Sequence, residues 1–88
     1  MCEFTLFITQ KNVTSKKLVE TVNTFLTESF SDRFRLNIVE VLRDPESALQ
    51  NSVMATPTLL KTVPAPSRQV TGNLWDKEQV LAGLGLAA

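Results

Sequence analysis

Two proline-marked breaks in the second half of the chain constrain its fold more than any other feature. Thr56-Pro57 must separate two kinds of segment, because proline fixes its own φ and pushes the residue before it out of the helical region. Pro64 and Pro66 cannot donate to a ladder, so they stop any strand that reaches them. We therefore predict a helical segment before Thr56, a strand from Thr58 to Val63, and a stiff turn after it.

The N-terminal half has the pattern of a strand, a long helix and a second strand. Apolar residues alternate with threonines from Phe4 to Thr9, which indicates an inner strand partly covered on its second face. A helix to about Phe30 follows, with Thr14 or Ser15 expected to cap its start. Its buried stripe should consist of Leu18, Val19, Val22, Phe25, Leu26 and Phe30. The stretch 34–42 begins as an alternating strand and becomes continuously apolar, so we expect it to be covered on both faces.

The C-terminal half predicts two more helices and a hairpin. Asp44-Pro45 supplies an N-cap and a first-turn proline for a short helix to about Ser52. The buried side of this helix should consist of Ala48, Leu49 and Val53. Arg68–Thr71 is expected to be the antiparallel partner of the preceding strand and an edge of the sheet. After the turn signal Gly72-Asn73, Asp76 should cap a last helix whose inward residues are Val80, Leu81 and Leu84.

These elements make one α/β domain, residues 1–88, with the order β-α-β-α-β-β-α and a mixed sheet. Nine basic and nine acidic residues leave a net charge of zero, which argues against nucleic acid as a partner. The sequence has no run of apolar residues long enough to span a membrane and no signal-peptide pattern at Met1, so we expect a cytoplasmic protein.

Two absences bear on chemistry. The chain has no histidine, the commonest general base and metal ligand, and its one cysteine excludes a Cys-x-x-Cys redox pair. That residue, Cys2, has no basic neighbour that would lower the pKa of its thiol and activate it. The one hydroxyl candidate for a nucleophile is Thr14-Ser15, and it has no base nearby. We therefore expect a non-enzymatic binding protein without a metal or cofactor.

The segment after residue 54 also carries a resemblance. It consists of Ala55-Thr56-Pro57-Thr58-Leu59, Lys61, Pro64, Pro66 and Gly72-Asn73-Leu74, supported by Asp44-Pro45, Val80-Leu81 and Gly83-Leu84. On these residues the chain resembles the KaiB family of bacterial circadian-clock proteins, within the thioredoxin-like superfamily. The match extends from about Phe4 to Leu86. The order of elements, read from the pattern alone, is also the thioredoxin-like one.

The resemblance implies that two folds are available. One is thioredoxin-like and binds partners, and the alternative is a rearranged ground-state fold, often tetrameric, in which the second half of the chain differs. The candidate switch positions are Thr56, Pro57, Gly72, Gly83 and Gly85. The Thr56-Pro57 bond is open to either isomer, because superfamily members hold it cis and base rates favour trans. Ala82, Gly85 and Ala87 depart from the family's usual C-terminal residues, which counts against the tetrameric form.

The resemblance also implies partners. The first is the hexameric KaiC ATPase, bound at its N-terminal ring. KaiA would be a further partner and the SasA kinase a competing one. Other copies of the chain, in a dimer or tetramer, are the third kind of partner. Candidate contacts are Lys61, Pro64, Arg68 and Arg43, whose cations form either one patch for an acidic surface or an ordinary solvated edge. Trp75 either anchors an interface or packs on Val80. Two further alternatives stay open. One is a SasA-like sensory adaptor domain, which shares the Ala55-Thr56-Pro57 segment. The other is a KaiB paralogue with a non-clock partner, because Gln10–Val13 differs from the family's first loop.

Overall fold

Strands and helices follow one another in the predicted order. The computed structural model describes residues 1–86, so Ala87 lies outside the described residues. The elements are β1 (Cys2–Ile8), α1 (Val13–Phe30), β2 (Phe34–Glu40), α2 (Pro45–Gln50), β3 (Thr58–Val63), β4 (Arg68–Thr71) and α3 (Lys77–Gly83).

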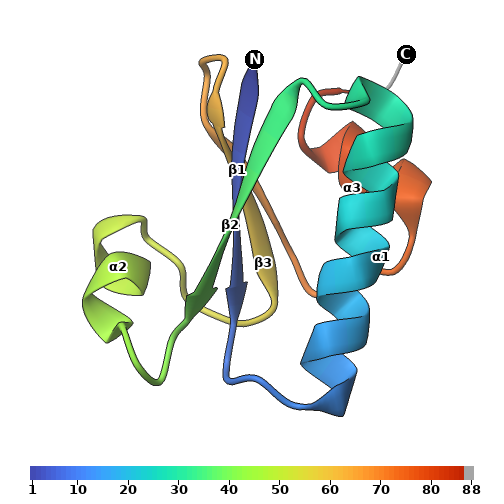
Figure 1. Cartoon of the computed structure of the whole chain (residues 1–88). Helices are drawn as coiled ribbons and strands as arrows, with labels where there is room; N and C mark the ends of the chain where they lie inside the picture. The colour runs from blue at the N-terminus through green and yellow to red at the C-terminus, as the bar shows by residue number, and fades with distance from the viewer. Residues whose placement is uncertain (87–88) are drawn as a thin grey trace.

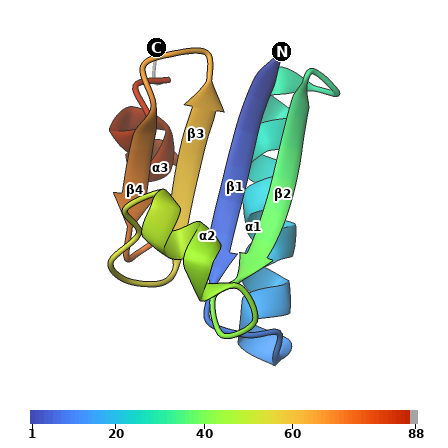
Figure 2. The same ribbon diagram turned by 90° about the vertical axis from the view of Figure 1, so that its left-hand side faces the viewer.

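The four strands form one mixed sheet in the order β2-β1-β3-β4 (Figure 2). β1 is parallel to β2 and antiparallel to β3, with a register shift between Glu3 and Phe4. β4 pairs antiparallel with β3 at the far edge. The predictions of an inner first strand and of a final edge strand are confirmed, and the thioredoxin-like arrangement is the one observed, in place of the rearranged alternative.

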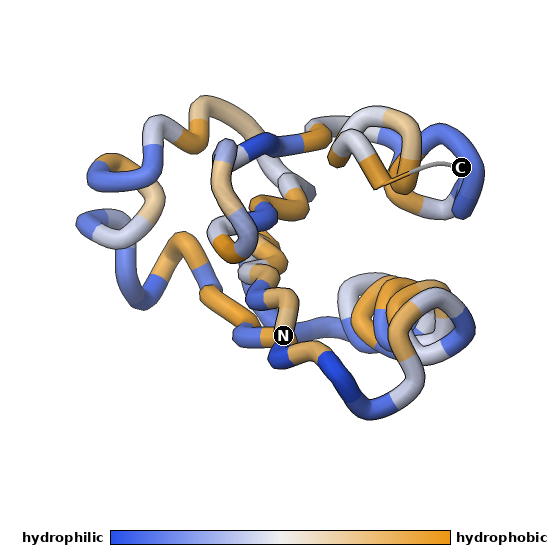
Figure 3. The backbone as a smooth tube through the Cα atoms, turned by 90° about the horizontal axis from the view of Figure 1, so that it is seen from above, coloured by the Kyte–Doolittle hydropathy of each residue, from blue (hydrophilic) through white to orange (hydrophobic). Residues whose placement is uncertain are grey.

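Helices cover the two faces of the sheet unequally. α2 lies on one side, and α1 and α3 lie together on the other (Figures 1 and 3). The larger core lies between the sheet and α1 with α3, and consists of Phe4, Leu6, Ile8, Leu18, Val22, Leu26, Leu59, Leu74, Val80 and Leu84. The smaller core, under α2, consists of Phe7, Ala48 and Leu60. β1 is buried against both cores because its alternate residues point to opposite faces.

The start of α1 differs from the prediction. Asn12, and neither Thr14 nor Ser15, is the N-cap. The Asn12 side chain accepts a hydrogen bond from the Ser15 N–H at 2.8 Å, and the Ser15 hydroxyl accepts one from the Asn12 N–H at 2.8 Å. This reciprocal pair forms a capping box, so Ser15 acts as its third helical residue, inside the helix that it was predicted to begin.

The prediction that the second strand is covered on both faces was wrong. β2 is an edge strand that ends at Glu40, and none of its residues is fully buried. Val41 and Leu42 belong to a turn, and Leu42 is 66% exposed. The reason is the position of α2, which packs over Phe7 and Leu60 in the middle of the sheet and leaves most of β2 uncovered.

The buried side of α2 was also predicted incorrectly in part. Ala48 is buried and Val53 packs against it, but Leu49 is 79% exposed. Successive residues of a helix point about 100° apart, so a helix this short with Ala48 facing the sheet must direct Leu49 toward solvent. The predicted cap is confirmed, since Asp44 accepts from the Ser47 N–H at 3.1 Å.

Candidate partner-binding site

Three of the predicted contact residues meet at one end of the β3–β4 hairpin. Lys61 and Arg68 lie opposite each other in the ladder, and Pro64 lies in the turn between the strands. We call Lys61, Pro64 and Arg68 the hairpin tip. Lys61 is only 5% exposed, and its Nζ donates a hydrogen bond of 3.0 Å to the Pro64 carbonyl. Its position gives it a direct role in holding the turn.

Arg68 lies against the end of α3. A Cβ added to Gly85 would lie 3.1 Å from the Arg68 Nε, so the guanidinium group lies beside the C-terminus of that helix. The C-terminal end of a helix carries a partial negative charge, which attracts a cation placed there. Gly85 has φ of 74°, a conformation that glycine adopts without steric cost. Arg68 remains exposed to solvent.

Arg43 does not join the hairpin tip. It follows β2, where its Nε lies 3.8 Å from a carboxylate oxygen of Glu40. Glu40 pairs with Ile8 at one end of β1, whereas the hairpin tip is level with the other end, where Glu3 pairs with Val63. The three predicted cations therefore do not form one patch.

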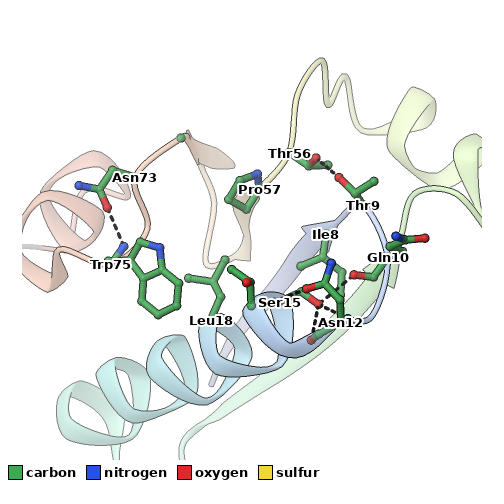
Figure 4. A pocket seen from close by; sticks show the side chains of 12 residues that line it. Ile8, Thr9, Gln10, Asn12, Ser15, Leu18, Thr56, Pro57, Asn73 and Trp75 are labelled. Carbon is green, nitrogen blue, oxygen red and sulfur yellow. Dashed lines mark hydrogen bonds between the residues drawn. The ribbon is translucent and has the colours of Figure 1, made fainter.

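An open cleft lies at the opposite end of the sheet from the hairpin tip. It has a volume of about 410 Å³ and lies between the start of α1, the Thr56-Pro57 segment and the loop that precedes α3 (Figure 4). Its lining residues are Ile8, Thr9, Gln10, Asn12, Thr14, Ser15, Leu18, Thr56, Pro57, Gly72, Asn73 and Trp75. We call it the Trp75 cleft.

Hydrogen bonds join the segments that line the Trp75 cleft. The hydroxyl groups of Thr9 and Thr56 bond to each other, and the Gly72 N–H donates to the Pro57 carbonyl at 3.1 Å. The Asn73 side chain accepts a hydrogen bond of 3.0 Å from the Trp75 N–H, which fixes the backbone at Trp75. The shape of the cleft therefore depends on contacts between the two halves of the chain.

The lining suits binding of an uncharged, partly apolar group. It combines the apolar side chains of Ile8, Leu18 and Pro57 with hydroxyl and amide groups, and includes no ionisable side chain. Trp75 leaves 46% of its surface exposed, and both roles predicted for it, interface anchor and packing on Val80, stay predictions. The sequence pattern identified Trp75 and Pro57 separately, but it did not predict that they line one cleft with the start of α1.

The candidate switch positions fall into two places. Thr56, Pro57 and Gly72 line the Trp75 cleft, and the Thr56-Pro57 peptide bond is cis. Gly83 lies where α3 crosses β4, and a Cβ added to it would come within 2.5 Å of the Val70 Cγ2. Gly83 and Gly85 thus both lie where α3 approaches β4, away from the cleft.

Among residues 1–86, every helix is too short or too polar to span a lipid bilayer. No group of three or more histidine, cysteine, aspartate and glutamate side chains in the same range could hold a metal ion.

Comparison with known proteins shows which family has this arrangement. A family model for the KaiB domain matches residues 5–86. The circadian clock oscillator protein KaiB of Cyanothece sp. is 36% identical over 81 residues, covering 92% of this chain and 77% of that protein. The chain belongs to the KaiB family. The KaiB of Microcystis aeruginosa is similar to it at 36% identity over 81 residues, covering 92% of this chain and 78% of that protein.

The fold of this KaiB-family chain is also found in a solved structure. The solution structure of the N-terminal domain of Synechococcus elongatus SasA matches with a TM-score of 0.77, covering 96% of this chain and 83% of that one. The sequences are 22% identical, so this likeness concerns the fold alone.

Proposed function

We propose that this KaiB-family chain is a non-enzymatic regulator of the circadian-clock type, which binds a KaiC-like ATPase in the cytoplasm and modulates its phosphorylation or activity. KaiA or a SasA-like kinase would be a second or competing partner. The names of the KaiB relatives support the clock role. The observation that carries the proposal in this chain is the Trp75 cleft, an open site with a half-exposed tryptophan and no ionisable lining residue.

The Trp75 cleft is the proposed anchor point for the ATPase. Tryptophan is enriched among the few side chains that contribute most of the binding energy at protein interfaces. Arg68 and Pro64 at the hairpin tip, and Arg43 at the end of β2, are exposed and are proposed as peripheral contacts with acidic surface. Lys61 contributes indirectly, because it holds the turn that carries Pro64.

Fold switching is the second part of the proposal. The Trp75 cleft takes Ile8, Ser15 and Leu18 from the first half of the chain, and Pro57 and Trp75 from the second. A fold in which the second half is rearranged therefore lacks the cleft. Only molecules in the thioredoxin-like fold bind, so the apparent affinity is reduced by the fraction of molecules in that fold.

The direct test is capture of the KaiC homologue from the same organism, with and without ATP, by the wild-type chain and by Trp75→Ala. We expect the substitution to weaken binding by about tenfold or more, because it removes the proposed anchor. Leu49→Ala is the matched control, since Leu49 is exposed and apolar but lies on α2, away from the cleft.

Each outcome of this capture experiment is informative. Full binding by Trp75→Ala would contradict the role of the cleft while leaving the partner in place. No binding by the wild-type chain in any nucleotide state would contradict the KaiC-like partner and favour a paralogue with a non-clock partner. Competition by KaiA or by a SasA-like kinase tests the second partner on the same immobilised chain.

Amide NMR spectra test the switching part separately. We expect two sets of backbone resonances in the free protein, with the Gly72 amide among those that differ, and one set after a partner is added. A single unchanged set before and after binding would mean that one fold is present throughout. A permanently thioredoxin-like chain would favour the SasA-like adaptor function, which the likeness to the SasA domain supports at the level of fold.

A further inference from the structure

Trp75 presents a flat aromatic surface to the cleft that it lines. The side chain leaves 46% of its surface exposed, and Figure 4 shows the indole ring extending beside Leu18, with Pro57 above the two side chains. Leu18 is only 4% exposed, so it forms part of the floor of the cleft. An aromatic ring beside other apolar side chains leaves a large apolar area in water, which a bound group can cover.

Hydrogen bonds on both sides of Trp75 hold this aromatic wall in place. Before it, the Asn73 side chain accepts from the Trp75 N–H at 3.0 Å. After it, Asp76 caps α3 by accepting from the N–H groups of Glu78 and Gln79 at 3.1 and 3.3 Å. A wall that is fixed in advance loses little conformational freedom when a ligand binds, and this favours affinity for a small molecule.

The charges near the cleft belong to other contacts. None of the twelve lining residues, all within residues 1–86, has an ionisable side chain. Lys11 and Lys16 line a separate groove between α1 and β2, and the Asp76 carboxylate is already used as the cap of α3. A charged ligand would lose water in the cleft without gaining an ion pair, so the lining selects an uncharged one.

Hydroxyl groups supply a polar side to the cleft. Thr9, Thr14 and Thr56 are lining residues, and the hydroxyls of Thr9 and Thr56 bond to each other. A hydroxyl can donate one hydrogen bond and accept two, so this pair keeps the capacity to bond a further group. The volume of about 410 Å³ lies within the range of small-molecule sites. The cleft therefore has room for a ring system with hydrogen bonds along one edge.

We propose that the Trp75 cleft binds an uncharged, planar aromatic small molecule, which stacks on the Trp75 indole ring and turns a hydrogen-bonding edge toward the threonine hydroxyls. Stacked aromatic pairs gain more than the burial of their area alone provides. A ligand in the cleft contacts both halves of the chain, so it stabilises the fold in which the cleft exists. The inference uses the cleft proposed above to anchor the ATPase, but it rests on this chain alone and does not require that partner.

NMR titration of the chain tests the site directly, because Trp75 is its one tryptophan and gives a single indole N–H resonance. Three bicyclic probes of similar size separate the predicted properties: 2-naphthol is aromatic and uncharged, decahydro-2-naphthol is saturated, and 2-naphthoate is charged. We expect 2-naphthol to shift the indole N–H and the Gly72 amide with a Kd below about 1 mM. The other two probes should bind at least about tenfold more weakly. No saturable shift of the indole N–H, or equal affinities for the three probes, would overturn the proposal.

Trp75→Leu keeps an apolar side chain in the cleft and removes the ring. Binding of 2-naphthol to this variant, followed at the Gly72 amide, should be weaker by at least about tenfold. Unchanged affinity would overturn the proposal. The amide spectrum of the variant without ligand separates loss of the ring from loss of the fold.

Thr14→Val and Thr27→Val form a matched pair of variants for the polar edge. Both remove the hydroxyl of an exposed threonine on α1, but only Thr14 lines the cleft. We expect Thr14→Val to weaken binding of 2-naphthol about fivefold and Thr27→Val to leave it unchanged. Equal effects of the two variants would overturn the proposed orientation of the ligand.

Discussion

At the scale of single residues, Lys61 has an apolar stem and a charged tip that face different surroundings. Its stem lies on the face of β3 that packs against α1 and α3, directly opposite Phe4 of β1. Its ammonium group has one described hydrogen bond, to the Pro64 carbonyl, although it can donate three. An ion enclosed with so few partners adds little to stability, whereas the packing of its stem adds more.

Lys61→Met therefore separates the two contributions. Methionine keeps the stem and removes the charge, so we expect the free energy of unfolding to stay within about 1 kcal/mol of wild type or to rise. Lys61→Ala removes the stem as well and should lower it by about 2 kcal/mol. Urea unfolding of the two variants measures the difference. Equal losses in both would mean that the ammonium contact with Pro64 dominates.

Asn12 tests the capping box at the start of α1. Asn12→Ala removes the side-chain acceptor of the Ser15 N–H, and we expect it to lower the free energy of unfolding by about 1 kcal/mol. Asn23→Ala, in the exposed middle of the same helix, is the control and should be neutral or slightly stabilising. Urea denaturation curves compare them, and an unchanged Asn12→Ala midpoint would contradict the role of the cap.

At the scale of elements, the sequence predicted each helix and strand but not always the direction it faces. Proline and glycine positions and apolar spacing are local signals, so β3, β4 and the cap of α2 were predicted correctly. Which side of a short helix faces the sheet depends on where the sheet lies, and Leu49 was assigned to the wrong side for that reason. β2 was expected to be covered because a local apolar run does not reveal where a distant helix packs.

Leu84 and Leu49 provide an element-scale comparison between α3 and α2. Leu84 is fully buried between α3 and the sheet, so Leu84→Ala should cost about 3 kcal/mol through lost burial and a cavity. Leu49→Ala should cost less than about 0.5 kcal/mol, because that side chain is already exposed to water. Chemical denaturation measures both, and similar costs would contradict the orientation of α2.

At the scale of the whole molecule, three separated segments make the Trp75 cleft. They are the loop and first turn around Ser15, the Thr56-Pro57 segment, and the loop that carries Trp75. Sequence reasoning identified Pro57, Gly72 and Trp75 as unusual positions. It could not bring them together, because that step requires the order of strands and the packing of α1 and α3. The absence of histidine and of a second cysteine, by contrast, could be read from the sequence directly.

Charge contributes little to the stability of the whole molecule. The ion pairs among residues 1–86 are Arg35–Glu3, Arg43–Glu40 and Lys77–Glu28, and at least one side chain of each pair is well exposed. Exposed pairs contribute about 0–1 kcal/mol each, and the net charge is zero. We expect the free energy of unfolding to change by less than about 1 kcal/mol between about 0.05 M and about 0.5 M NaCl. Calorimetry in the two buffers measures the change. A larger loss of unfolding free energy at high salt would mean that these ion pairs contribute more to stability than exposed pairs usually do.

The central place of β1 has a consequence for synthesis on the ribosome. β1 is translated before its neighbour β3, which begins only at Thr58. A nascent chain that has not reached β3 therefore carries an apolar strand with one flank unoccupied, and that strand is open to wrong partners while translation continues.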